Sequence, residues 1–388
     1  MGFKEVVLRE TKKIFKSRLA IAITIFIPLT LCLMICLIFS QGSPKNLPVA
    51  VLDDDNSSIS RMIVRYLNVM PSIEVKYRVS DYRSGNQLLT EGKVYGFVAI
   101  PKNFERDIYR LKQPSLLLYY NGQRILIGGI ISKDITMLVQ TISVGIDAKI
   151  RAKRGVPMSE AIKQAYLIKI DDHVRSNPYF NYQYFLSIVA FGHILQISML
   201  LSAVWALGTE FKYGTAKEWL ECANNSIVIA FLGKMFPYFC IFTTIFFILY
   251  FVYFVLLHAP YSGNILIGFI INIMFIITCL TMSAIFLIVA RGNFRLALSS
   301  SAFYVAMGFA FAGVTFPVMS MPLAAKIYSA ILPLSYYAQV MIDQSLKNIP
   351  AIYDLKFAIA LTGLGLWGIV NLPLLKMFAI DENRWYKL

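Results

Sequence analysis

Residues 265–290 read ILIGFIINIMFIITCLTMSAIFLIVA and contain no charged side chain. A helix needs about 20 mostly apolar residues to cross the hydrocarbon core of a membrane, which is about 30 Å thick. This stretch therefore predicts a transmembrane helix. Of the 388 residues, 57% are hydrophobic and 15% are charged, whereas about a quarter of the residues in a soluble protein are charged. The composition excludes a wholly soluble fold.

Five further stretches meet the same length requirement. We predict an α-helical polytopic membrane protein with six transmembrane helices, at Leu19–Phe39, Tyr184–Leu207, Phe231–Leu257, Ile265–Ala290, Leu296–Phe316 and Phe357–Leu375. Basic residues precede the first stretch, as in a signal peptide. Its apolar run of 21 residues is too long for a signal peptide, however, and no small-residue cleavage site follows it. We interpret it as a membrane anchor.

Lys and Arg in short flanking segments predict the orientation, because such residues concentrate on the cytoplasmic side. They cluster before Leu19, in the segment after residue 207, at Arg291 and Arg295, and in the tail. Both termini are therefore expected in the cytoplasm. The predicted organisation is a cytoplasmic interfacial helix (1–18), span one (19–39), an extracytoplasmic, periplasmic domain (40–183), spans two to six (184–376) and a cytoplasmic tail (377–388).

The block of residues 40–183 is polar and carries 20 Lys and Arg against 13 Asp and Glu, a net +7 of the total +15. Apolar runs at Leu47–Leu52 and Val94–Ile100, and the alternation over Ile73–Val79, predict strands. Helical patterns separate them, and a long one follows over Ile125–Lys153. This order predicts an inserted α/β domain. All five cysteines lie outside the block, so no disulfide is expected within it.

Two flanking segments are expected at the membrane surfaces. Residues Phe3–Arg18 form a basic amphipathic helix pattern that suits the inner interface. Its apolar side is predicted to comprise Phe3, Val6, Val7, Ile14 and Phe15. Residues 317–350 are divided by prolines into apolar pieces too short to cross alone. They are expected to be re-entrant or interfacial on the outer side, where protein must satisfy their backbone.

No catalytic or nucleotide-binding motif is present. The phosphate-binding pattern G-x-x-x-x-G-K-[ST] does not occur, so we expect no enzyme activity and no cofactor in this chain. Despite the +15, no nucleic-acid motif is present, and no nucleic-acid partner is expected. The run Asp53-Asp54-Asp55 invites a calcium interpretation. It lacks the glycine and the bidentate glutamate of a calcium loop, so we favour a strand end followed by a helix cap and assign no metal site.

The predicted spans contain neutral polar residues but no carboxylate or lysine at membrane depth. This disfavours a proton or sodium relay and suits an apolar or amphipathic cargo. The candidate pathway residues, in spans two and five and the re-entrant segment, are His193, Gln196, Ser202, Phe309, Phe316 and Tyr336. The alternative is that such residues only pack the helices, and that His193 makes a helix–helix hydrogen bond.

The segment Gly208–Cys222 joins spans two and three within a cytoplasmic loop, residues 208–226. It predicts a short amphipathic helix whose Trp219 and Leu220 dock into a partner, while acidic and basic residues set its charge pattern. Its pattern of apolar and charged residues is equally typical of an ordinary interfacial helix.

Three motifs resemble the permease subunits of ABC-2 type exporters over essentially the whole chain. Glu210-x-x-x-Gly214-Thr215, followed by Trp219-Leu220 and Gly233-Lys234, resembles the coupling segment of that family, with Lys212 where relatives often have a second acid. The segments 47–60 and 316–337 resemble the start of the outer domain and the segment before span six. The resemblance implies that ATPase coupling involves Glu210, Gly214, Thr215, Lys217, Glu218, Trp219 and Leu220.

The resemblance further implies a permease in the bacterial inner membrane, surrounded by lipid. It would dimerise with itself or a paralogue and sit on a separate ATPase that binds ATP and magnesium. Relatives with this outer domain often work with a periplasmic adaptor and an outer-membrane channel, and export drugs or lipid-like compounds. The alternative from another class is a membrane-anchored sensor or scaffold whose outer domain binds a ligand.

Overall fold

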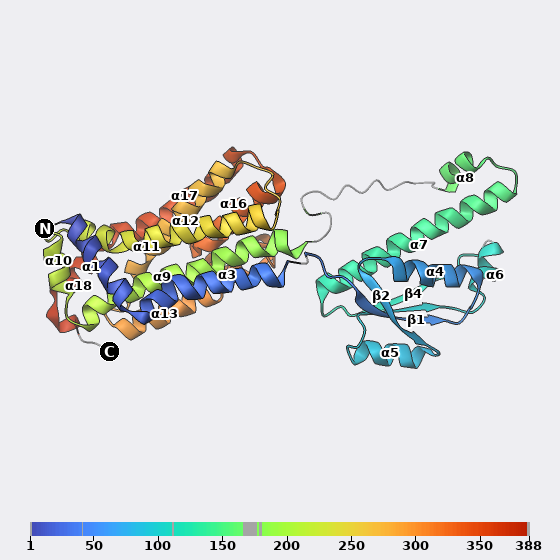
Figure 1. The fold of residues 1–388 in the computed structure, drawn as a ribbon, viewed down its shortest axis with the longest axis horizontal. Coiled ribbons are helices and arrows are strands. Elements are labelled where there is room, and N and C mark those ends of the chain that lie inside the picture. Colours follow the sequence, from blue (N-terminus) through green and yellow to red (C-terminus); the bar gives the residue numbers. More distant parts are fainter. Residues whose placement is uncertain (1, 41, 111, 166–176, 178–180, 386–388) are drawn as a thin grey trace. The chain divides into compact units, whose positions relative to one another are not determined.

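The computed structural model describes residues 2–40, 42–110, 112–165, 177 and 181–385. The chain folds as two compact units (Figure 1). One comprises Met1–Ser43 and Val174–Leu388, and we call it the helical unit. The other comprises Pro44–His173, and we call it the α/β unit.

The helical unit is built from helices and short π- or 3₁₀-helical turns. In chain order these are α1 (Phe3–Lys16), α2 (Arg18–Ile21), η1 (Ala22–Phe26), α3 (Ile27–Ile38), η2 (Gln183–Ser187), α9 (Ile188–Lys212), α10 (Ala216–Cys222), α11 (Ile227–Tyr250), η3 (Phe251–Leu256), α12 (Ile265–Val289), α13 (Phe294–Ala306), α14 (Gly308–Phe311), η4 (Val318–Ser320), α15 (Leu323–Ile331), α16 (Pro333–Ile342), η5 (Asp343–Lys347), α17 (Ala351–Val370), α18 (Leu372–Ile380) and η6 (Glu382–Arg384).

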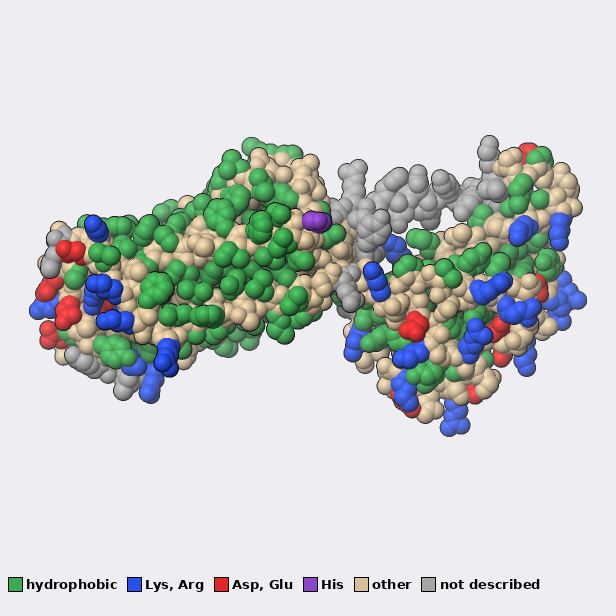
Figure 2. All heavy atoms as spheres, in the orientation of Figure 1, with side chains coloured by type: hydrophobic (Ala, Val, Ile, Leu, Met, Phe, Trp, Pro, Cys, Tyr) green, Lys and Arg blue, Asp and Glu red, His purple; other side chains and the backbone are tan. Residues whose placement is uncertain are grey.

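Five helical stretches of this unit are long and apolar enough to cross a membrane: Arg18–Ile38, Gln183–Lys212, Ile227–Leu256, Ile265–Val289 and Ala351–Ile380. They coincide with five of the six predicted spans. Apolar side chains cover the flank of the unit, and charged side chains gather at the end that carries α1, α10 and α18 (Figures 1 and 2). This distribution is the one expected of a multi-pass membrane protein.

The predicted span Leu296–Phe316 is not a continuous helix, and that expectation is corrected. It divides into α13, of 13 residues, and α14, of four. A 13-residue helix is about 20 Å long, which is shorter than the hydrocarbon core. Two glycines accompany the interruption: Gly308 approaches His193, and Gly313 has a φ of +82, in the left-handed region that glycine favours.

The segment after α14 contains two helices, as its prolines predict. Pro333 begins α16, which packs against α9, α12 and α17. The Tyr337 ring of α16 is buried and stacks on Phe275, with 4.3 Å between the ring centroids. Surrounding protein therefore shields α16, whereas Leu323 and Ile327 of α15 are exposed.

The α/β unit contains a four-stranded sheet in the order β2-β1-β3-β4, in which β1 is parallel to β2 and β3, and β4 is antiparallel to β3. Helices α4 and α7 cover one face and α5 the other (Figure 1). The predicted order of strands and helices is confirmed. The elements are β1 (Leu47–Asp53), α4 (Ser58–Val69), β2 (Ile73–Val79), α5 (Tyr82–Thr90), β3 (Gly96–Ile100), α6 (Phe104–Tyr109), β4 (Leu117–Tyr120), α7 (Ile125–Lys153) and α8 (Met158–Ala165).

The sixth helix with the length and hydropathy of a span is Leu126–Lys153, within α7. Its apolar face packs on the sheet, where Ile130, Ile131 and Ile135 join the core formed with β1 and α4. The apolar residues of α7 therefore form part of the hydrophobic core of the α/β unit.

The aspartates after β1 bind the local backbone. The Asp53 carboxylate accepts hydrogen bonds from the Asn56 amide (2.9 Å) and the Ser60 hydroxyl (2.8 Å). The Asp55 carboxylate accepts from the amides of Phe104 and Glu105, at the start of α6. Ser57 caps α4 through a capping box with Ser60. The strand-end and cap interpretation is confirmed.

Candidate functional site

Helix α1 packs against α11 at a point where α11 has no side chain. A Cβ atom on Gly233 would lie 2.9 Å from the Val6 Cβ, so only glycine permits this approach. The face of α1 turned inward carries Val6, Glu10 and Ile14, at helical spacing. The predicted apolar side of α1 is therefore corrected: Phe3 and Phe15 are exposed, and a glutamate lies on the buried face.

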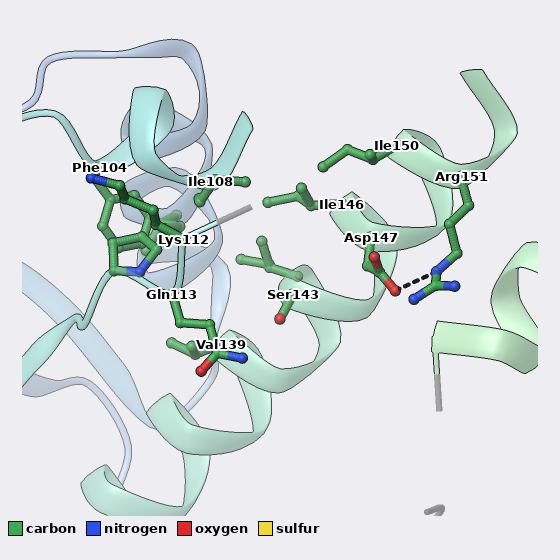
Figure 3. A pocket seen from close by; sticks show the side chains of 13 residues that line it. Phe104, Ile108, Lys112, Gln113, Val139, Ser143, Ile146, Asp147, Ile150 and Arg151 are labelled. Carbon is green, nitrogen blue, oxygen red and sulfur yellow. Dashed lines mark hydrogen bonds and ion pairs between the residues drawn. The ribbon is translucent and has the colours of Figure 1, made fainter. Parts of the chain in front are cut away.

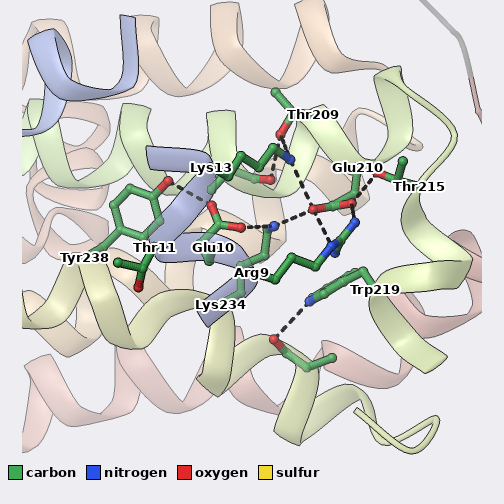
Figure 4. Close-up of polar contacts among 12 residues, drawn as sticks. Arg9, Glu10, Thr11, Lys13, Thr209, Glu210, Thr215, Trp219, Lys234 and Tyr238 are labelled. Carbon is green, nitrogen blue, oxygen red and sulfur yellow. Dashed lines mark hydrogen bonds and ion pairs between the residues drawn. The ribbon is translucent and has the colours of Figure 1, made fainter. Parts of the chain in front are cut away.

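Lys234, the residue after Gly233, is completely buried between two carboxylates (Figure 4). Its Nζ lies 2.5 Å from Glu10 Oε2 on α1 and 2.6 Å from Glu210 Oε1 on α9. The Tyr238 hydroxyl donates to the other Glu10 oxygen at 3.0 Å. One ammonium on α11 thus joins three helices that are distant in sequence.

Glu210 also receives donors from two half-buried side chains of α1. Arg9 Nη1 and Nη2 donate to its two oxygens at 3.3 and 3.0 Å, and Lys13 Nζ donates to Oε1 at 3.1 Å. The Thr215 hydroxyl donates to Glu210 Oε2, and Lys13 also donates to the Thr209 hydroxyl at 2.8 Å. Both oxygens of the Glu210 carboxylate therefore accept from more than one donor.

We call Arg9, Glu10, Lys13, Glu210 and Lys234 the buried charge cluster. Its three cations face two carboxylates within the cluster, and Arg9 also lies 4.0 Å from the exposed carboxylate of Glu218. A buried ion pair is tolerated only when its charges are paired and hydrogen-bonded. Burial lowers the pKa of Lys13, and the positive charge of Lys234 lowers it further. The carboxylates of Glu210 and Glu10 partly restore that pKa.

The predicted loop 208–226 begins later than expected, because α9 continues to Lys212. Gly214, with a φ of +69, then turns the chain into α10. The Trp219 side chain is buried, its Nε1 donates to the Ala230 carbonyl at 3.1 Å, and Leu220 is buried as well. Neither side chain is available to dock into a partner, so that expectation is corrected.

The exposed face of α10 is charged and belongs to Lys217, Glu218 and Glu221. Glu218 lies 4.0 Å from Arg9, so the exposed face connects with the buried charge cluster. The helix itself contacts α1, α9, α11 and α18. Of the predicted coupling residues, the structure therefore places Lys217 and Glu218 on the surface, and Glu210, Trp219 and Leu220 inside.

The candidate pathway residues do not form one group. The His193 and Phe309 rings lie near each other, with 5.7 Å between their centroids. Gln196 is buried, and the Ser202 hydroxyl donates to the Ser198 carbonyl in its own helix. Tyr336 donates to the Ala330 carbonyl at 2.6 Å, and Phe316 is exposed. The Ser202 hydroxyl is therefore satisfied within its own helix.

Sequence reasoning missed several buried charges of the helical unit. Glu10 was recognisable, since it stands four residues from both Val6 and Ile14. Asp354 in α17 is buried and accepts from Gln344 Nε2 at 2.6 Å, and Asp343 in η5 is buried and pairs with Lys347 at 2.7 Å. These carboxylates lie outside the predicted spans, so the absence of carboxylates from the spans stays a prediction, whereas Lys234 falls within the predicted span Phe231–Leu257. These groups are paired or hydrogen-bonded.

The α/β unit contains a cavity of about 540 Å³ between α4, α6 and α7 (Figure 3). Its walls are apolar and include Ile108, Ile142 and Ile146. Its rim is polar and carries Lys112 and the ion pair of Arg151 Nε with Asp147 Oδ2, 2.8 Å apart. Such a cavity matches a molecule with an apolar body and a polar end.

The fold and the buried charge cluster define a multi-pass membrane protein in which an N-terminal helix is tied by ion pairs to the membrane helices. The family model described as ABC-2 family transporter protein matches residues 18–374, and the chain belongs to that family. Its members are membrane subunits of transporters and not themselves enzymes. Among curated proteins, none matches this sequence.

Proposed function

We propose that the chain is the permease subunit of an ABC exporter. It moves a hydrophobic or amphipathic substrate, drug-like or lipid-like, outward across the bacterial inner membrane. A separate ATPase subunit, which holds ATP and magnesium, binds the charged face of α10 and drives transport. Two permease copies, or this chain and a paralogue, form the translocation route, and a periplasmic adaptor and an outer-membrane channel extend it.

The observation that carries this proposal is the position of α10. Glu218 on its exposed face lies 4.0 Å from Arg9 of the buried charge cluster, and that cluster ties α1, α9 and α11 together. A force applied to α10 therefore reaches three helices at once, through ion pairs that fix their relative positions. The cavity of the α/β unit, with apolar walls and a charged rim, supports an amphipathic substrate.

The course of α9 supports the proposed orientation. With 25 residues α9 is about 37 Å long, longer than the hydrocarbon core. Helix α10 follows its C-terminal end, whereas the α/β unit is inserted before its N-terminal end. At that end Phe39 and Tyr182 stack, with 5.9 Å between ring centroids, so the chain leaves and re-enters the helical unit at one place. An α9 that spans the membrane puts α10 and the α/β unit on opposite sides, and the basic residues of the short flanking segments favour the cytoplasmic side for α10.

The test reverses one exposed charge on α10. Glu221→Lys is expected to leave the unfolding temperature of the purified chain unchanged, because the side chain is exposed. It should reduce both co-purification of the ATPase and substrate-stimulated ATP hydrolysis in proteoliposomes by about tenfold, the effect of losing about 1.4 kcal/mol of interaction.

Glu74→Lys, an equal charge change at an exposed position of the α/β unit, is the matched control and should keep both activities. Equal ATPase recovery and coupling in Glu221→Lys and wild type would reject α10 as the docking helix. If wild-type protein in mild detergent carries no ATPase subunit at all, the sensor or scaffold alternative is favoured instead.

A further inference from the structure

A second cavity of the α/β unit, of about 650 Å³, lies at the carboxyl ends of β1 and β2, beside the first two turns of α4. Three of its lining residues are arginines: Arg61 and Arg65 on α4, and Arg78 on β2. Arg61 and Arg65 are four residues apart and so share one face of their helix. In open α/β sheets, ligands bind outside the carboxyl ends of the strands.

A bulge in β2 directs Arg78 to this place. Val75 pairs with Val49, but the next residue of β1, Ala50, pairs with Tyr77, so Lys76 is the extra residue. Ile73 and Val75 accordingly join the core on the α4 side, whereas Tyr77 joins the core on the α5 side. Because neighbours alternate along a strand, Arg78 then faces α4. Bulges commonly re-aim a side chain in this way.

Three arginines and one carboxylate line this cavity, so positive charge is in excess. Within the residues that the structure describes, none of these arginines forms a salt bridge. Arg61 Nη1 donates to the Asn56 carbonyl at 2.5 Å. The one carboxylate of the lining, that of Asp53, already accepts from the Ser60 hydroxyl and from the amides of Asp55 and Asn56. Like charges gathered in a concavity create a local positive potential that attracts an anion.

We propose that this cavity binds a phosphate-bearing anion through Arg65 and Arg78, with Arg61 completing the positive wall. A planar guanidinium donates two parallel hydrogen bonds to phosphate oxygens, which makes arginine the favoured residue for such groups. The volume exceeds that of a bare phosphate and lies within the range of small-molecule sites. A phospholipid headgroup and a soluble phosphate compound share this chemistry. The inference does not depend on the exporter assignment.

The experiment titrates the full-length chain, purified in a neutral detergent, by calorimetry at constant ionic strength. The probes are inorganic pyrophosphate and glycerophosphoglycerol, which is the deacylated form of an anionic phospholipid. We expect saturable binding of at least one probe. Stronger binding of pyrophosphate indicates a soluble ligand, and stronger binding of glycerophosphoglycerol indicates a lipid headgroup.

The variant Arg65→Gln/Arg78→Gln should weaken that binding by about tenfold or more, since it removes two charge-assisted hydrogen-bonding groups. The matched control, Arg83→Gln/Arg110→Gln, removes the same charge from exposed positions outside the cavity and should bind within about twofold of wild type. If the first double variant fails to fold, Arg65→Gln alone supplies the comparison. Binding of neither probe, or an equal loss in the control, overturns the proposal.

Discussion

Lys234 has a central place in the helical unit. It is completely buried, and it contacts carboxylates from α1 and α9 at 2.5 and 2.6 Å. Taking these charges out of water costs several kcal/mol each, and their mutual attraction repays this only while all partners are present. Glu210 is therefore a structural residue as well as a coupling candidate. Glu210→Ala should therefore destabilise the fold, whereas the same substitution at an exposed loop position would leave the stability nearly unchanged.

Replacing Lys234 by methionine should destabilise the protein by about 3–5 kcal/mol, because Glu10 and Glu210 would remain buried without their shared cation. Denaturant titration in detergent, followed by tryptophan fluorescence, measures this directly. All four tryptophans lie in the helical unit, and the Trp219 ring centroid is 5.6 Å from Lys234 Nζ.

Lys326→Met is the matched control, because it removes an ammonium group that is exposed. It should change the free energy of unfolding by less than about 0.5 kcal/mol. The double variant Glu10→Gln/Lys234→Met should cost less than the sum of the two single variants, since the pair is coupled. Strict additivity would show that the ion pair contributes nothing.

At the scale of elements, the contact between α1 and α11 shows which features an amphipathic sequence pattern predicts and which it does not. The basic amphipathic pattern of residues 3–16 correctly predicts a helix. The location of this helix at the inner membrane interface stays a prediction, and the structure adds that one face of α1 packs on α11 and buries Glu10. Helical periodicity specifies which residues share a face, but it does not specify whether lipid or protein covers that face.

Gly233→Ala should push α1 away from α11. The added methyl would meet the Val6 Cβ at 2.9 Å, and a Cβ, unlike the end of a long side chain, moves only with its backbone. We expect a loss of about 1–3 kcal/mol in the free energy of unfolding, together with faster hydrogen exchange in α1, which mass spectrometry measures.

Gly363 on α17 provides the matched comparison, because a methyl group added there would meet no neighbouring segment within 4 Å. Gly363→Ala should be neutral or stabilising by up to about 1 kcal/mol through helix propensity. Equal effects of the two substitutions would mean that the approach of α1 to α11 does not require glycine.

At the scale of the whole molecule, the proposed orientation predicts which surfaces are accessible from outside the cell. In a cysteine-free background, Lys102→Cys in the α/β unit should react with a membrane-impermeant maleimide in intact cells. Lys217→Cys on α10 should react only after the cells are opened. Both positions are exposed, so burial does not protect either one. Labelling of Lys217→Cys in intact cells would contradict the orientation and the cytoplasmic docking of an ATPase.

The sequence alone determined the features that depend on local composition. Long apolar runs predicted five of the membrane helices, because the membrane sets their length. Short apolar runs and one alternating stretch predicted the strands of the α/β unit. The segment Gly233-Lys234 marked a site whose partners the sequence did not reveal. The split of α13 from α14 was also not foreseen, since glycine is tolerated within membrane helices.

Tertiary structure decided how the polar residues of distant segments combine. Glu10, Glu210 and Lys234 are more than 20 residues apart from one another, and only the packing of α1, α9 and α11 brings their charges together. In the α/β unit, a single extra residue in β2 turns Arg78 to the face that carries Arg61 and Arg65. Composition and periodicity act along the chain, whereas ion pairing and strand register depend on contacts between segments, and the folded protein alone supplies those contacts.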